Sequence, residues 1–112
     1  SIEPWVRVDN DLTPHATVIE ASGRDRQGLL AELAAVLANA RISIDSAHID
    51  ANGERVSDVF YVREETGGQI TEARRIAAVR AELETALRRG EPEAPADPAR
   101  NPLAVARAST AR

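Results

Sequence analysis

Two segments of different hydrophobic period meet at Gly23-Arg24-Asp25-Arg26-Gln27-Gly28-Leu29-Leu30. The run before this junction, Ala16–Ala21, is β-like, whereas Leu29–Ala40 repeats its apolar residues at helical spacing. A strand that turns through two glycines into a helix leaves backbone N–H groups free at the helix N-terminus. Such groups suit a small anion, for example an amino-acid carboxylate. This junction is therefore the first candidate for a binding site.

The segments around the junction predict four strands and two helices. In chain order they are strands Trp5–Val8 and His15–Ser22, helix Leu29–Ala40, strands Ile42–Ala51 and Glu54–Glu64, and helix Glu72–Arg89 after a Thr71 cap. The order β-β-α-β-β-α predicts an α+β fold of ferredoxin-like type, with a four-stranded antiparallel sheet and two helices on one face. The usual version ends in a strand after the second helix. Because this sequence offers no convincing one there, we expect the N-terminal strand to replace it.

The third predicted strand changes phase along its length. Ile42 and Ile44 share one parity, but the apolar residues from Ala47 onward have the other. One extra residue near Asp45–Ser46, a β-bulge, would keep all of them on the core, and bulges often lie beside sites. The pair Asn52-Gly53 then predicts a type I′ hairpin turn.

The fourth predicted strand is apolar on both faces. Val59 and Tyr61, at odd positions, share one face of the strand. The other face carries Val56, Phe60 and Val62, at even positions. One face can rest on the helices, so we expect the other to meet a second copy or a neighbouring domain. Asp58, inside this strand, is expected to face solvent or to pair with an arginine.

Composition narrows the class of protein. The 112 residues suffice for one domain with a modest core, and the net charge of −4 comes with arginine as the only basic side chain. These arginines are scattered and aromatics form only 3% of the chain, which argues against nucleic-acid binding. No apolar window long enough for a membrane span is present, nor a signal peptide. The absence of cysteine excludes thiol chemistry and fits a cytoplasmic protein.

Neither a metal site nor a catalytic site is predicted. His15 and His48 fall on different strands without carboxylates at ligand spacing, so no metal or other cofactor is expected. An acylphosphatase-like site would need a loop arginine and an asparagine on the neighbouring strand, but Ile42–Ala51 offers only Ser, Asp and His. We therefore expect Arg24 and Arg26 to be solvated loop charges.

The stretch Ala16–Arg63 resembles an ACT domain, the small-molecule-sensing module of many amino-acid-regulated proteins. Three blocks carry the resemblance, at residues 23–30, 42–49 and 53–62. The last two look most like the C-terminal ACT domain of the bacterial uridylyltransferase/uridylyl-removing enzymes, which modify the PII signal protein according to glutamine supply. The resemblance implies a glutamine-sensing regulatory domain at residues 15–90, after an N-terminal strand and turn at 1–14. Residues 91–112, rich in Pro and Ala, are expected to form a disordered tail.

The resemblance also implies a site between two ACT domains, in a homodimer or with an adjacent ACT domain of the parent enzyme. Carried over by position, the loop supplies Asp25, Gln27 and the backbone of Gly28 and Leu29, and the partner domain supplies Ser43 and Asp45. Asp25 would hold the α-ammonium of L-glutamine or another amino acid, and the helix N-terminus its carboxylate. Ser43 or Gln27 would bond a side-chain amide.

Two alternatives remain open from the sequence. Asp25 can instead cap the helix while Gly28 only permits close packing, and the domain is then a docking or dimerisation module without a ligand. The domain can also serve as the amino-acid sensor of another metabolic enzyme. The resemblance implies that the chain is a regulatory fragment and no enzyme itself. The catalytic domains of its parent, a nucleotidyltransferase and phosphodiesterase by that resemblance, lie elsewhere.

Overall fold

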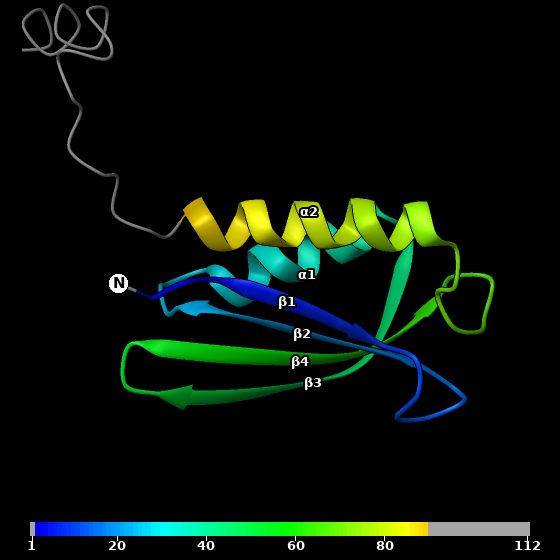
Figure 1. Ribbon diagram of the computed structural model, residues 1–112, viewed down its shortest axis with the longest axis horizontal. Helices are drawn as coiled ribbons and strands as arrows, with labels where there is room; N and C mark the ends of the chain where they lie inside the picture. The colour runs from blue at the N-terminus through cyan, green and yellow to red at the C-terminus, as the bar shows by residue number, and fades with distance from the viewer. Residues whose placement is uncertain (1, 90–112) are drawn as a thin grey trace, which may run out of the picture.

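Residues 2–89, which the computed structural model describes, form a four-stranded antiparallel sheet with two helices on one of its faces (Figure 1). The elements are β1 Trp5–Asp9, β2 Thr17–Arg24, α1 Leu29–Asn39, β3 Ile42–Asn52, β4 Arg55–Glu64 and α2 Ala73–Arg89. The predicted α+β fold and its β-β-α-β-β-α order are therefore confirmed. The predicted tail at residues 91–112 lies outside the described residues.

The N-terminal strand takes the place that a final strand has in the usual ferredoxin-like fold. The strands follow the order β1-β2-β4-β3, and every neighbouring pair is antiparallel. In β1, Val6 lies opposite Ala21 and Val8 opposite Ile19, so its apolar residues share the helix-facing side of β2. β1 completes the sheet at four strands, as predicted.

The core lies between the sheet and the two helices. Alternate residues of β2 and β4 point to the helices and are buried together with the apolar stripes of α1 and α2. They include Ile19, Ala21, Val56, Phe60, Val62, Leu33, Leu37, Leu83 and Leu87. Removing these side chains from water, at about 25 cal/mol per Å² of apolar surface, is the main force that holds the two layers together.

Of the two glycines at the junction, only one turns the chain. Gly28 has a φ of 82° and precedes the first residue of α1. Gly23 still belongs to β2, and a Cβ there would lie 3.2 Å from Cδ2 of Leu87 on α2. The prediction that both glycines form the turn is wrong, because Gly23 serves the close approach of β2 to α2.

The helix caps also differ from the prediction. No side chain caps α1, so Asp25 is not its cap, and the N-cap position belongs to Gly28. At α2, the cap is Glu72 rather than Thr71, since its carboxylate accepts hydrogen bonds from the backbone N–H groups of Arg74 (3.2 Å) and Arg75 (3.0 Å). The bulge predicted in β3 is confirmed, since Ile44 pairs with Val62 and Ser46 with Tyr61, which leaves Asp45 as the extra residue.

The outer part of β3 is exposed, although the bulge keeps its apolar residues on the helix-facing side. Ile42 is buried, but Ile44 and Ile49 are 36% and 57% exposed. The prediction that this whole strand lies on the core is therefore wrong, because the helices cover only its beginning. The hairpin prediction also needs correction. The two turn residues are Gly53 and Glu54, and positive φ at Gly53 alone fits a type II′ turn instead of type I′.

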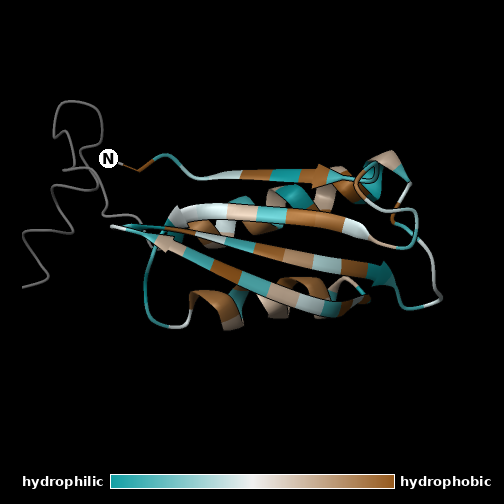
Figure 2. Ribbon diagram, turned by 90° about the horizontal axis from the view of Figure 1, so that it is seen from below, coloured by the Kyte–Doolittle hydropathy of each residue, from teal (hydrophilic) through white to brown (hydrophobic). Residues whose placement is uncertain are grey.

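The other face of the sheet carries no helix of the described chain, and Figure 2 looks onto it. Val59 and Tyr61 point to this side and are half-buried by their neighbours. The Tyr61 ring meets that of His48 edge to face, with centroids 5.8 Å apart. This face is a mixture of apolar and charged side chains, and what covers it is not shown by residues 2–89.

Candidate functional site

A pocket of about 150 Å³ opens at the N-terminus of α1. The β2–α1 loop, the first turn of α1 and the facing parts of β3 and β4 form its walls. The lining residues are Asp25, Arg26, Gly28, Leu29, Leu30, Ala31, Ile49, Val56 and Asp58. The backbone N–H of Asp25 donates to the carbonyl of Glu54 (2.8 Å) and so fastens the loop to the β3–β4 turn.

The first turn of α1 presents unused hydrogen-bond donors to this region. The N–H of Glu32 is the first to bond within the helix, to the carbonyl of Gly28 (3.0 Å). Within residues 2–89, the N–H groups of Leu30 and Ala31 have no acceptor, since no side chain caps the helix. Free N–H groups and the helix dipole give this end about half a positive charge, which favours an anionic group.

Asp58 brings a buried carboxylate to the opposite wall. It is only 2% exposed, and no hydrogen bond or ion pair to it is found among the described residues. Its strand neighbours across the sheet are Ala21 on β2 and Ile49 on β3. Burial, and secondarily the Asp25 carboxylate, raise the pKa of Asp58. The expectation that Asp58 faces solvent or pairs with an arginine is wrong.

The sequence contained a signal for this placement. Asp58 has the same parity as Val56 and Phe60, the residues expected on the buried face of the strand. A period of two fixes the face of a strand residue whatever its polarity. Sequence reasoning missed Asp58 because a lone charged residue is usually placed in water.

The two loop arginines are engaged within the fold and are not solvated charges. Arg26 donates to the Glu32 carboxylate and to the carbonyl of Ala86 (3.1 Å), although it also lines the pocket. Arg24 pairs with Glu54 at 3.1 Å. These contacts brace the loop against α1, α2 and the β3–β4 turn, so we correct the expectation made from the sequence.

The structure brings some of the predicted site residues together. Asp25, Gly28 and Leu29 line the pocket, whereas Gln27 is exposed in the same loop and does not line it. Ser43 and Asp45 lie near the start of β3, about 20 Å and about 13 Å from Ile49 at strand spacing. Within one chain they are thus remote from the pocket, in keeping with the resemblance, which assigns them to a partner domain.

Asp45 is also held by an ion pair. Nε and Nη2 of Arg63 each donate to its carboxylate at 2.8 Å. This pairing lowers the pKa of Asp45 and fixes the side chain of the bulge residue. Any ligand group that approaches Asp45 from a second domain therefore meets a carboxylate shared with Arg63.

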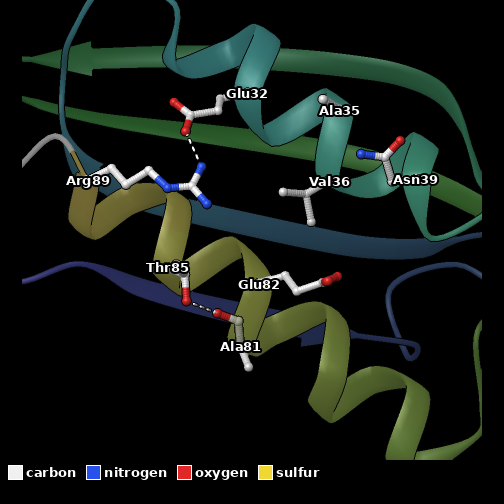
Figure 3. Close-up of a pocket in the computed structure, with 8 residues that line it drawn as sticks. All are labelled: Glu32, Ala35, Val36, Asn39, Ala81, Glu82, Thr85 and Arg89. Atoms are coloured by element: carbon white, nitrogen blue, oxygen red, sulfur yellow. Dashed lines mark hydrogen bonds and ion pairs between the residues drawn. The ribbon is translucent and has the colours of Figure 1, made fainter.

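A larger hollow, of about 400 Å³, lies between the outer faces of α1 and α2 (Figure 3). It is lined by Glu32, Ala35, Val36, Asn39, Ala81, Glu82, Thr85 and Arg89. Figure 3 shows Glu32 and Arg89 bonded to one another across it, and the Thr85 hydroxyl donates to the carbonyl of Ala81 (2.9 Å). Several of its polar groups are already satisfied, and none of the predicted site residues lines it. The pocket at α1 is the better candidate.

Residues 2–89 contain neither a cluster of metal-ligating side chains nor a helix that could cross a membrane. No group of three or more His, Cys, Asp or Glu side chains is placed to hold a metal ion. No helix in this range is long and apolar enough to cross a membrane.

The fold and the pocket define a small α+β domain with a recess at the N-terminus of its first helix. The family described as "ACR family N-terminal ACT domain" matches residues 12–90, and the chain belongs to the ACT domain family. ACT domains of this family are regulatory, and so is this one. No solved structure matches the chain.

Three curated relatives are bifunctional uridylyltransferase/uridylyl-removing enzymes. Those of Caulobacter vibrioides and Phenylobacterium zucineum are 53% and 48% identical over all 112 residues of this chain. That of Rhodopseudomonas palustris is 43% identical over 90 residues, or 80% of this chain. The chain spans 12% of the length of the first two relatives and 10% of that of the third. These relatives confirm the resemblance stated from the sequence.

Proposed function

We propose that this chain is the amino-acid-sensing domain of a uridylyltransferase/uridylyl-removing enzyme and that its ligand is L-glutamine. The observation that carries the proposal is the uncapped N-terminus of α1, which opens into a pocket rimmed by Asp25. The helix end suits the α-carboxylate of an amino acid, and Asp25 suits its α-ammonium. The similarity to bifunctional uridylyltransferase/uridylyl-removing enzymes supports this identity of the parent protein.

The pocket has the features of half a site. Its volume of about 150 Å³ is well below the ~300 Å³ at which ligand pockets usually begin. Leu30 and Ile49, both partly exposed, form an apolar rim beside it. A second ACT domain placed against this rim would enlarge the pocket and bring its own Ser43 and Asp45 to the ligand. The partner is a second copy or an adjacent ACT domain of the parent enzyme.

Regulation then follows from a shift in population. Glutamine bound between two ACT domains stabilises the paired arrangement and biases the distant active sites that modify and demodify the PII protein. It can do so only to the extent that it binds one arrangement more tightly than the other. A cytoplasmic location is part of this proposal, and the lack of cysteine fits it.

A docking module without a ligand is the second candidate. The exposed apolar residues of β3, an edge strand, favour it, because such an edge pairs readily with another chain. A third candidate is a sensor of a different amino acid in another enzyme.

Titration calorimetry of the chain with L-glutamine, beside light scattering for mass, tests the proposal. We expect saturable heat from glutamine and none from L-glutamate or L-serine. We expect Asp25→Asn to weaken binding by about tenfold, because a charge-assisted hydrogen bond is lost. Asp11→Asn, at an exposed turn residue, is the matched control. Absence of heat from all three ligands would favour the docking module, and heat from serine alone would favour another sensor.

A further inference from the structure

Asp58 is the one buried carboxylate of residues 2–89, and nothing in that range compensates its charge. It lies between Val56 and Phe60 on the helix-facing side of β4, and no arginine reaches it. An ionised carboxylate without a partner is strongly unfavourable inside a protein. A cationic group from outside the chain is the natural partner for such a side chain.

The surroundings of Asp58 define what that cation must be. Its carboxylate lines the pocket at α1, with Asp25 close enough to raise its pKa. Two carboxylates therefore line the pocket, and so does the first turn of α1, where the N–H groups of Leu30 and Ala31 have no acceptor within residues 2–89. Leu29 and Ile49 form an apolar part of the pocket wall. A small molecule that is positive at one end and negative at the other matches this arrangement.

We propose that Asp58 is a ligand-binding residue, whose buried carboxylate accepts hydrogen bonds from the ammonium group of an amino acid held in the pocket. The inference rests on the proposed function of the same pocket, and it adds the group that recognises the charge of the ligand. Asp58 makes the pocket selective for α-amino acids. A 2-hydroxy or 2-oxo acid of the same shape leaves the carboxylate uncompensated, and a phosphate or dicarboxylate is repelled by it.

Binding of the amino acid should also be coupled to the release of a proton from Asp58. Burial raises the pKa of Asp58, so the free domain holds a proton there to higher pH than an ordinary aspartate does. The charged groups around it are Asp25 and Arg26 of the loop, and Arg26 is already bonded to Glu32. The facing residues of β2 and β3, Ala21 and Ile49, carry no charge. An arriving ammonium favours the ionised form, so below the raised pKa each binding event releases up to one proton.

The test compares Asp58→Asn, which keeps the size of the side chain and removes its charge, with Asp50→Asn, at an exposed position of β3. We expect Asp58→Asn to weaken L-glutamine binding by about a hundredfold. We expect the same variant to unfold at higher urea concentration than the unmodified chain, because a buried unpaired charge is gone. Asp50→Asn should change neither property. If Asp58 had only a structural role, its replacement would lower stability instead.

A second measurement needs no variant. Calorimetry of the unmodified chain at about pH 5 and about pH 7, in buffers of different ionisation enthalpy, should show proton release that is larger at the lower pH. The 2-hydroxy analogue of glutamine should bind at least tenfold more weakly than glutamine.

The outcomes separate the two proposals. Amino-acid binding that survives in Asp58→Asn overturns the role of Asp58 and leaves the sensing function standing. No amino-acid binding by the unmodified chain overturns both.

Discussion

At the scale of single residues, Arg41 stands out because its backbone is left-handed. It follows α1 with a φ of 61°, and it is the one residue other than glycine with positive φ in residues 2–89. Helices often end on a left-handed residue, which is usually glycine because other side chains are strained there. Asn39 is the last residue of α1, and the strained position lies two residues further on.

Replacing Arg41 by glycine should therefore stabilise the domain. We expect Arg41→Gly to raise the free energy of unfolding by about 0.5 to 1 kcal/mol, since relief of strain exceeds the added entropy of the unfolded chain. The Arg41 side chain is exposed, so little contact is lost. Urea denaturation measures the change. Arg80→Gly, exposed inside α2, is the control and should lower stability by about 1 kcal/mol. A loss of stability in Arg41→Gly would show that its conformation is unstrained.

Single residues also show how far the sequence could predict the site. Asp25, Gly28 and Leu29 of the predicted loop line the pocket, and the loop could be located because a strand, a glycine and a helical stripe are local signals. Asp58 was placed on the wrong side, although its parity matched that of buried residues. The tendency of aspartate to be exposed is an average over many proteins. The alternation of side chains along a strand is a geometric constraint, and it places Asp58 on the buried face.

At the scale of elements, Glu32 joins three parts of the fold. Its carboxylate accepts hydrogen bonds from Arg26 in the β2–α1 loop and from Arg89 at the end of α2. The bonds from Arg26, and then those from Arg89, lower the pKa of Glu32. No sequence pattern predicts this cluster, since Arg89 is 57 residues away and meets Glu32 only after α2 has packed.

Removing the charge of Glu32 should loosen these elements in a pH-dependent way. The folded pKa lies below the unfolded one, so the stabilisation is complete above the ordinary glutamate pKa and is lost as the pH falls through the folded pKa. We expect Glu32→Gln to lower the free energy of unfolding by about 1 kcal/mol at about pH 7 and by almost nothing at about pH 2.

Urea denaturation across this pH range measures the effect. Glu82→Gln, which removes one exposed charge from α2, is the matched control and should change stability little at any pH. A deficit of Glu32→Gln that persists unchanged into acid would mean that the ion pairs are not its cause.

In β3, the position of the strand and its bulge could be predicted from the sequence, but the exposure of its side chains could not. The bulge at Asp45 followed from a change of parity, a local property that the sequence displays. Exposure of Ile44 and Ile49 depends on where α1 ends above the sheet, which is a property of the packed layers. The turn was shifted by one residue because the Asn-Gly preference competes with the register of the whole β3–β4 ladder.

At the scale of the whole molecule, three of the five exposed large apolar side chains of residues 2–89 lie on β3 or at the start of α1. Ile44 and Ile49 lie on the edge strand β3, and Leu30 lies on α1 beside the pocket. Edge strands of this length are usually protected from pairing by charge or by a covering segment. An edge strand with exposed isoleucines next to a half-sized pocket is expected when pairing and ligand binding occur at one interface.

This coupling predicts the behaviour of a variant at the rim. Ile49 is 57% exposed, so Ile49→Glu should leave the stability of the single domain within about 0.5 kcal/mol of its value. A buried charge at the interface should nevertheless abolish pairing and weaken glutamine binding together. Sedimentation and calorimetry at matched protein concentrations measure both. Leu12→Glu, 68% exposed in the β1–β2 turn, is the control and should change neither. If Ile49→Glu lost pairing but bound glutamine as before, the pocket would be complete within one chain, and the second domain would serve the transmission of the signal only.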